Sequence, residues 1–126
     1  MRKPISFLAT DDADGALHFY RDVLGLELIE ASPFALVFDD GGQMLRVQKV
    51  AHVEPASNTA HGWEVGDIHA EIATLSQRGV QFSRYEALEQ DERGVWTSPD
   101  GHKIAWFRDP SGNNLSLTEF TPAKAP

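Results

Sequence analysis

The sequence repeats itself, and this repeat constrains the fold more than any other feature. Ala9-x-Asp11 precedes one expected helix, and Val65-x-Asp67 precedes another at an offset of 56 residues. An aspartate at either place can accept a hydrogen bond from the free N–H groups that begin a helix, and Asp12 could do so as well as Asp11. Alternating apolar residues follow each helix, so each copy predicts a βαβββ module.

The turns repeat as well. Phe38-x-Asp40-x-Gly42 matches Phe107-x-Asp109-x-x-Gly112 with one inserted residue, and 45–47 then falls on 115–117. Module one is expected over about 4–50 and module two over about 60–120, joined by a linker at 51–59. A chain of 126 residues suits one α+β domain in which the two modules form a curved, half-barrel-like mixed sheet with helices on the convex face.

The element boundaries follow from periodicity and turn chemistry. The helix stripes are Ala13, Leu17, Tyr20 and Leu24 in module one, and Ile68, Ile72 and Leu75 in module two, with ends at Gly25 and Gly79. Residues 86–94 are charged and poorly patterned, which indicates a mobile loop, and residues 121–126 are expected to fray. The expected strands are 4–9, 26–30, 34–38, 44–50, 61–65, 80–85, 95–98, 103–107 and 115–120.

Composition excludes several classes of protein. The net charge of −8 argues against binding to nucleic acids and anionic membranes. The chain has no cysteine, which rules out disulfides and thiolate zinc sites and is compatible with a reducing cytoplasm. No apolar run suggests a signal peptide or a membrane span, so a cytoplasmic protein is expected.

Three segments carry a family resemblance across nearly the whole chain. They are Phe19-Tyr20-x-x-Val23-Leu24-Gly25-Leu26, then Val65-x-Asp67 with Gly79-Val80, and Phe107-Arg108-Asp109-Pro110-Ser111-Gly112-Asn113. In this order they resemble the vicinal oxygen chelate superfamily, which includes glyoxalase I, bleomycin-resistance proteins and extradiol dioxygenases. The resemblance implies two βαβββ modules around a cavity and, in many members, a metal bound by four side chains.

The residues at the implied metal positions are Pro4, Arg46, Ala60 and Ser116. None is a good ligand for a divalent cation, because two have no side-chain donor, arginine is always cationic and serine is a weak neutral ligand. No metal and no cofactor are therefore expected. A shift of one residue in strand register would bring His61 into the cavity, whereas the unshifted register places it beside Trp63 on the side facing the helix.

Strand alternation predicts what lines the cavity instead. Trp106 is either an aromatic wall or a core residue. Arg46 is expected either to pair with Glu64 or to hold an anionic group of a ligand, because an unpaired buried charge is costly. The predicted ligand-binding side chains are Ser6, Arg46, Gln48, Glu64, Trp106, Ser116 and Thr118.

Three functions remain open. The first is a metal-independent protein that binds a small organic molecule, for sequestration or sensing, as the resemblance to bleomycin-resistance proteins implies. The second is a small-molecule lyase, isomerase or dioxygenase-like enzyme that uses Glu64 as a general base or a metal at His61. The third is an interaction domain without a ligand. A homodimer is expected, since exposed sheet edges must be paired or covered.

Overall fold

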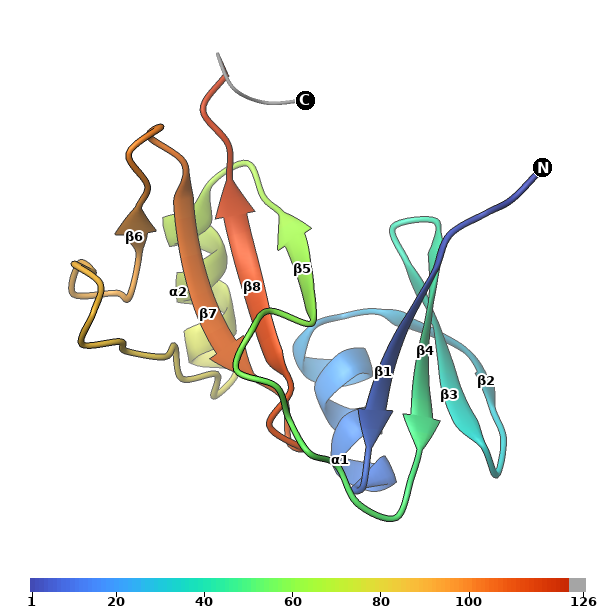
Figure 1. Ribbon diagram of the computed structural model, residues 1–126. Coiled ribbons are helices and arrows are strands. Elements are labelled where there is room, and N and C mark those ends of the chain that lie inside the picture. The colour runs from blue at the N-terminus through green and yellow to red at the C-terminus, as the bar shows by residue number, and fades with distance from the viewer. Residues whose placement is uncertain (123–126) are drawn as a thin grey trace. The chain divides into compact units, whose positions relative to one another are not determined.

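The strands form two separate four-stranded sheets rather than one (Figure 1). The computed structural model describes residues 1–122, so residues 123–126 of the predicted frayed tail lie outside the described part. Of the described residues, one compact unit holds 1–60 and 109–113, and the other holds 61–108 and 114–122. The α+β class and the two βαβββ modules are confirmed.

The first unit contains a sheet of order β1-β4-β3-β2, with β1 parallel to β4 and the other pairs antiparallel. Gly41 and Gly42 make the predicted tight turn between β3 and β4, with φ of +61° and +91°. Positive φ at both central residues suits the twist of a hairpin. The strands are β1 (Ile5–Thr10), β2 (Glu27–Ala31), β3 (Ala35–Asp40) and β4 (Gln43–Lys49).

The helical segment of the first unit begins as α1 (Ala13–Leu17) and continues as a π-helix, η1 (His18–Val23). In the wider turn the N–H of Leu24 bonds the carbonyl of Phe19 at 2.9 Å. Because the π-helix changes the helical period, the residues that face inward differ from the predicted stripe. Only Tyr20 belongs to both sets. The buried residues are Ala16, Phe19, Tyr20 and Val23.

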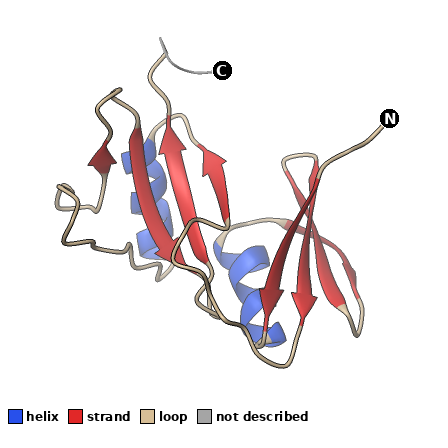
Figure 2. Ribbon diagram, in the orientation of Figure 1, coloured by secondary structure: helices blue, strands red, loops and turns tan. Residues whose placement is uncertain are grey.

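The second unit contains a sheet of order β5-β8-β7-β6, with α2 (Ile68–Gln77) against one face (Figure 2). The predicted stripe of Ile68, Ile72 and Leu75 is buried there. Asp67 accepts a hydrogen bond from the N–H of Ala70 at 3.2 Å and thereby caps α2 as predicted. The strands are β5 (His61–Glu64), β6 (Trp96–Thr97), β7 (Lys103–Arg108) and β8 (Asn114–Glu119).

The predicted strand over 80–85 is wrong. Its residues make a single bridge, Phe82 to Phe107, because the segment leaves the sheet after one pairing. Among the described residues, no helix is both long and apolar enough to cross a membrane.

The turn at 109–113 belongs to the first unit although β7 and β8 on either side belong to the second. The buried Asp109 carboxylate accepts hydrogen bonds from Tyr20 Oη at 2.6 Å, from the N–H groups of Ser111 and Asn113 at 3.0 and 2.9 Å, and from Asn113 Nδ2 at 2.8 Å. Asn113 Nδ2 also donates to the carbonyl of Ala9 at 2.8 Å. Burial, and then the charge of Asp109, raise the pKa of Tyr20, so its hydroxyl remains a donor.

We predict that Tyr20→Phe lowers the free energy of unfolding by about 1–3 kcal/mol, because a buried carboxylate loses a donor. Urea unfolding followed by circular dichroism measures the loss.

Tyr85→Phe is the matched control. The Tyr85 hydroxyl is also buried, but no described residue bonds it, so its removal should leave stability unchanged or slightly raised. Equal losses in the two variants would contradict the role assigned to Asp109.

Candidate functional site

The second sheet has one face covered by α2 and one face turned away from it. Leu115, Leu117, Ala105 and Phe107 are buried on the helix side. Register places the alternate residues in two rows on the other face, which we call the open face, one row through Gly62, Ser116 and Trp106 and one through Glu64, Thr118, Ile104 and Trp96. Ser116, in the central strand, is buried. The structure therefore brings together four of the predicted residues, Glu64, Trp106, Ser116 and Thr118, and their role in binding stays a prediction.

Three aromatic rings meet on this open face. Tyr85 lies edge-on to Trp106 with ring centroids 5.6 Å apart, and Trp96 lies 6.2 Å from Trp106. Both distances are in the range of favourable aromatic pairs. Trp106 remains partly exposed, so it is not fully enclosed in a core, and its role as a wall of a ligand site stays a prediction.

Tyr85 is held in place by a segment whose ordered hydrogen bonds could not be predicted from the sequence. Gln90 Nε2 donates to the carbonyls of Ser83 and Gly94 at 3.0 and 2.8 Å, while its Oε1 accepts from the N–H of Tyr85 at 2.7 Å. A single amide thus crosslinks both arms of residues 83–95, which we call the Gln90 strap. The segment predicted to be a mobile loop is irregular but densely hydrogen-bonded.

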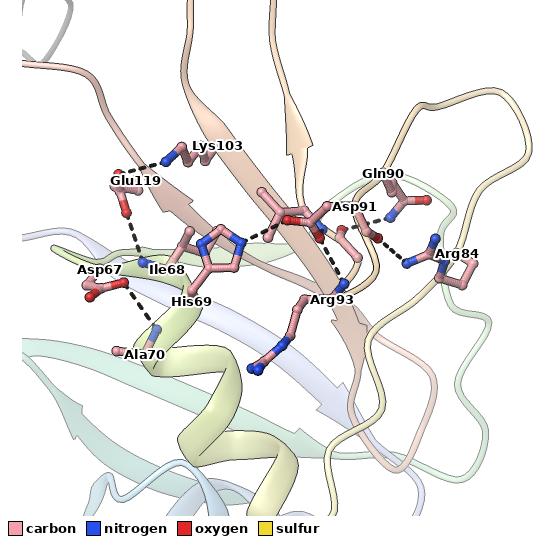
Figure 3. Close-up of polar contacts among 12 residues, drawn as sticks. Asp67, Ile68, His69, Ala70, Arg84, Gln90, Asp91, Arg93, Lys103 and Glu119 are labelled. Atoms are coloured by element: carbon pink, nitrogen blue, oxygen red, sulfur yellow. Dashed lines mark hydrogen bonds and ion pairs between the residues drawn. The ribbon is translucent and has the colours of Figure 1, made fainter.

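Asp91 fastens the same strap to α2 (Figure 3). His69 Nε2 lies 2.8 Å from Asp91 Oδ2, and Oδ1 accepts from the N–H groups of Arg93 and Val95, each at 2.9 Å. Burial acts to raise the pKa of Asp91, but the hydrogen bonds from His69, Val95 and Arg93 outweigh it and hold that pKa below its usual range. The carboxylate form is thus the one that closes the strap.

Gly62 is needed on the open face for steric reasons. A Cβ at this position would lie 2.5 Å from Ser116 Oγ and 3.1 Å from the Ser116 carbonyl. The hydroxyl of Ser116 therefore occupies the space beside β5 that a side chain would otherwise take.

Arg46 and Gln48 lie in the first unit, on the open face of β4, where Phe7 is the β1 partner of Arg46. Ser6 does not share this face, because its partner is the buried Leu45. Ser6 Oγ instead accepts a hydrogen bond from Gln43 Nε2 at 2.6 Å. The predicted grouping of Ser6 with Arg46 is therefore wrong.

The error comes from the choice of helix cap. Asp12, not Asp11, accepts from the N–H of Gly15 at 3.0 Å, so the match to Val65-x-Asp67 is Thr10-x-Asp12. The resemblance implies that the first metal position lies five residues before the first residue of this motif, so the change from Ala9 to Thr10 moves that position from Pro4 to Ile5. Asp11 bonds Ser111 and Val53 instead, and its hydrogen bond from Ser111 is the main cause that lowers the pKa of Asp11.

The corrected positions still do not fit a divalent cation. Isoleucine has no donor atom, and Arg46, Ala60 and Ser116 are unchanged as poor ligands. His61 packs with its ring 4.8 Å from Trp63 and pairs with the buried Leu115, which confirms the unshifted register. Among the described residues, no three His, Cys, Asp or Glu side chains gather as a metal site would require.

The predicted pair of Arg46 and Glu64 joins residues of different units. Within its own unit, neither side chain forms an ion pair with a described residue. Their pairing stays a prediction.

Sequence reasoning missed Tyr85, Gln90, Asp91 and Trp96. Trp96 could have been found, because pairing the short strand at 95–98 with 103–107 puts it in phase with Ile104. Gln90 and Asp91 carry no periodic signal, since most of their partners are backbone atoms within a turn-like segment and His69, the other partner of Asp91, lies 22 residues away.

We predict that Asp91→Asn lowers stability at pH 7 by up to about 1 kcal/mol, because the partly exposed carboxylate accepts hydrogen bonds from two backbone N–H groups and lies 2.8 Å from His69. A lowered carboxyl pKa contributes stability above the unfolded-state value near 3.8 that is lost as the pH falls through the folded value. Urea unfolding at pH 7 and pH 3 should therefore show the difference shrinking at low pH. Glu89→Gln, on the same strap, is the control, and a difference that grows in acid would refute the assignment.

Solved structures share this fold. Lactoylglutathione lyase from Agrobacterium tumefaciens aligns with a TM-score of 0.72 at 22% identity, covering 94% of this chain and 92% of its own. A glyoxalase/bleomycin resistance protein/dioxygenase superfamily member from Sphaerobacter thermophilus gives 0.73 at 22%, covering 95% and 98%. TioX from Micromonospora gives 0.70 at 18%, covering 96% and 100%. At these identities the likeness shows the fold alone.

A search of curated proteins finds no match to the sequence. The family model for the Glyoxalase/Bleomycin resistance protein/Dioxygenase superfamily matches residues 5–117, nearly the whole chain. The chain therefore belongs to the glyoxalase/bleomycin resistance protein/dioxygenase superfamily.

Proposed function

We propose that this protein binds a small organic molecule with a planar apolar part, without a metal, on the open face of the second sheet. The observation that carries the proposal is the contact of Tyr85 and Trp96 with Trp106, beside the polar side chains of β5 and β8. Aromatic walls with a few placed polar groups are typical of small-molecule sites.

The polar groups supply orientation. Thr118 offers a hydroxyl and Glu64 a carboxylate in the same row, whereas the hydroxyl of Ser116 is buried beside Gly62. Hydroxyls donate and accept, whereas a carboxylate only accepts, so a ligand with at least one donor group suits this face.

Catalysis is the competing proposal. One similar structure is named a lactoylglutathione lyase, and Glu64 is placed on the open face where it could act as a general base. A metal-dependent lyase reaction has poor support, because the residues at the implied metal positions are poor ligands for a divalent cation. Turnover that Glu64→Gln abolishes while affinity is kept would favour an enzyme.

Two further features are proposed for the protein as a whole. Among the described residues, β1, β2 and β5 each have one edge without a strand partner, which favours a homodimer, and the absence of cysteine favours a cytoplasmic location. On the first sheet, Arg46 is a candidate anchor for an anionic group, since no described side chain of its unit pairs with it.

We predict that planar aromatic fragments quench tryptophan fluorescence saturably and that Trp106→Ala weakens the best fragment by about tenfold, because stacking contributes on the order of 1–1.5 kcal/mol. Fluorescence titration measures the dissociation constants.

Trp63→Phe is the control, since it changes an indole on the helix side of the same sheet, where Trp63 stacks on Phe107. A loss of affinity in Trp63→Phe together with none in Trp106→Ala would refute the proposed face.

A separate prediction concerns metal. After dialysis against Zn²⁺, Mn²⁺ or Fe²⁺, elemental analysis should find no stoichiometric ion, because a divalent site needs at least three good donors. Tight 1:1 uptake that is lost in His61→Ala would contradict both this prediction and the assigned register.

A further inference from the structure

The second unit contains a cavity that is not part of the aromatic face described above. Its volume is about 310 Å³, and it lies between α2 and residues 80–93. Neither Tyr85, Trp96 nor Trp106 lines it. It is therefore separate from the ligand face proposed above.

The floor of this cavity is apolar, and the side chains that form it pack against the core of the unit. Ile72 and Val80 are buried, and Phe82 packs on the buried Phe107 with ring centroids 5.4 Å apart. An apolar floor on ordered side chains needs no rearrangement to receive an apolar ligand.

The rim is cationic. Arg84 is oriented by its bond from Nη1 to the Asp91 carbonyl at 2.6 Å, which leaves its other N–H groups available. Arg93 extends away from Asp91 in Figure 3, and its guanidinium makes no hydrogen bond or ion pair with any residue that the structure describes. Glu92 is the single carboxylate of the lining, so the rim has an excess of positive charge in a protein of net charge −8.

A structural role for the arginines is the main rival. Ser76 of the lining lies in the last turn of α2, where cations stabilise the carbonyl end of a helix. That role accounts for the sign of the charge. It does not account for the half-buried Phe82 ring beside two guanidinium groups.

We propose that this cavity binds a small organic anion, with a carboxylate or phosphate on Arg93 and Arg84 and an apolar body on Phe82, Val80 and Ile72. A guanidinium fork matches the geometry of such oxyanions. The volume is at the lower limit for ligand pockets, so a ligand with one ring fits.

Benzoate, titrated into ¹⁵N-labelled protein, tests the proposal. We expect saturable amide shifts at Ser76, Phe82 and Arg93, with a dissociation constant on the order of millimolar for so small a ligand. Benzyl alcohol, similar in shape but neutral, should bind about tenfold more weakly, as expected when a charge-assisted hydrogen bond is lost.

Variants separate binding from structure. Arg93→Ala should weaken benzoate by about ten- to a hundredfold, and Arg93→Lys by less, because lysine keeps the charge without the fork. Arg21→Ala, in the first unit and paired with Asp22, is the matched control and should leave affinity unchanged. If Arg93→Ala does not fold, Arg93→Gln replaces it.

Several results would overturn the proposal. They are equal affinity for benzyl alcohol, shifts confined to Tyr85, Trp96 and Trp106, and a lower melting temperature in Arg93→Ala with an unchanged dissociation constant. Because benzoate is followed at amides of the cavity, failure here leaves the ligand face of the second sheet untouched, and failure there leaves this cavity untouched.

Discussion

The first unit depends on the hydrogen bonds that the Asp109 carboxylate, buried beneath Tyr20, accepts. This carboxylate accepts hydrogen bonds from a phenol 89 residues away and from the backbone of its own turn. A buried charge without these donors would cost several kcal/mol, so Tyr20 and the N–H groups of the turn stabilise the carboxylate where it lies. The turn at 109–113 belongs to the first unit, although β7 before it and β8 after it belong to the second.

Strand alternation then decides which side chains are available for chemistry. In each sheet one set of residues packs under a helix and the alternate set faces the other way, where Val37 and Ser116 in the inner strands are buried as well. On the second sheet the open set includes Trp106 and Glu64, and Gly62 makes room for Ser116. The superfamily fold thus supplies the surface, while the identity of a few residues decides which chemical groups that surface presents.

Most of the fold was predictable, and the errors have local causes. Asp11 and Asp12 are equally good caps by sequence, and choosing the first shifted β1 by one residue, which exchanged its faces and misplaced Ser6. The stripe of the first helix was misassigned because nothing in the sequence marks a π-helical turn. Of the candidate site, the parity of Glu64, Trp106, Ser116 and Thr118 was predicted correctly.

The sequence by itself determined the two modules, the helix ends and the hairpin at Gly41 and Gly42, because capping, periodicity and turn chemistry act over a few residues. Only the tertiary structure decided that Tyr85 meets Trp106, that Gln90 crosslinks its strap and that Tyr20 reaches Asp109. These contacts join segments whose residue patterns have no common periodicity along the sequence. Their partners are selected by packing and by the need to satisfy buried polar groups, which exist only once the chain has folded.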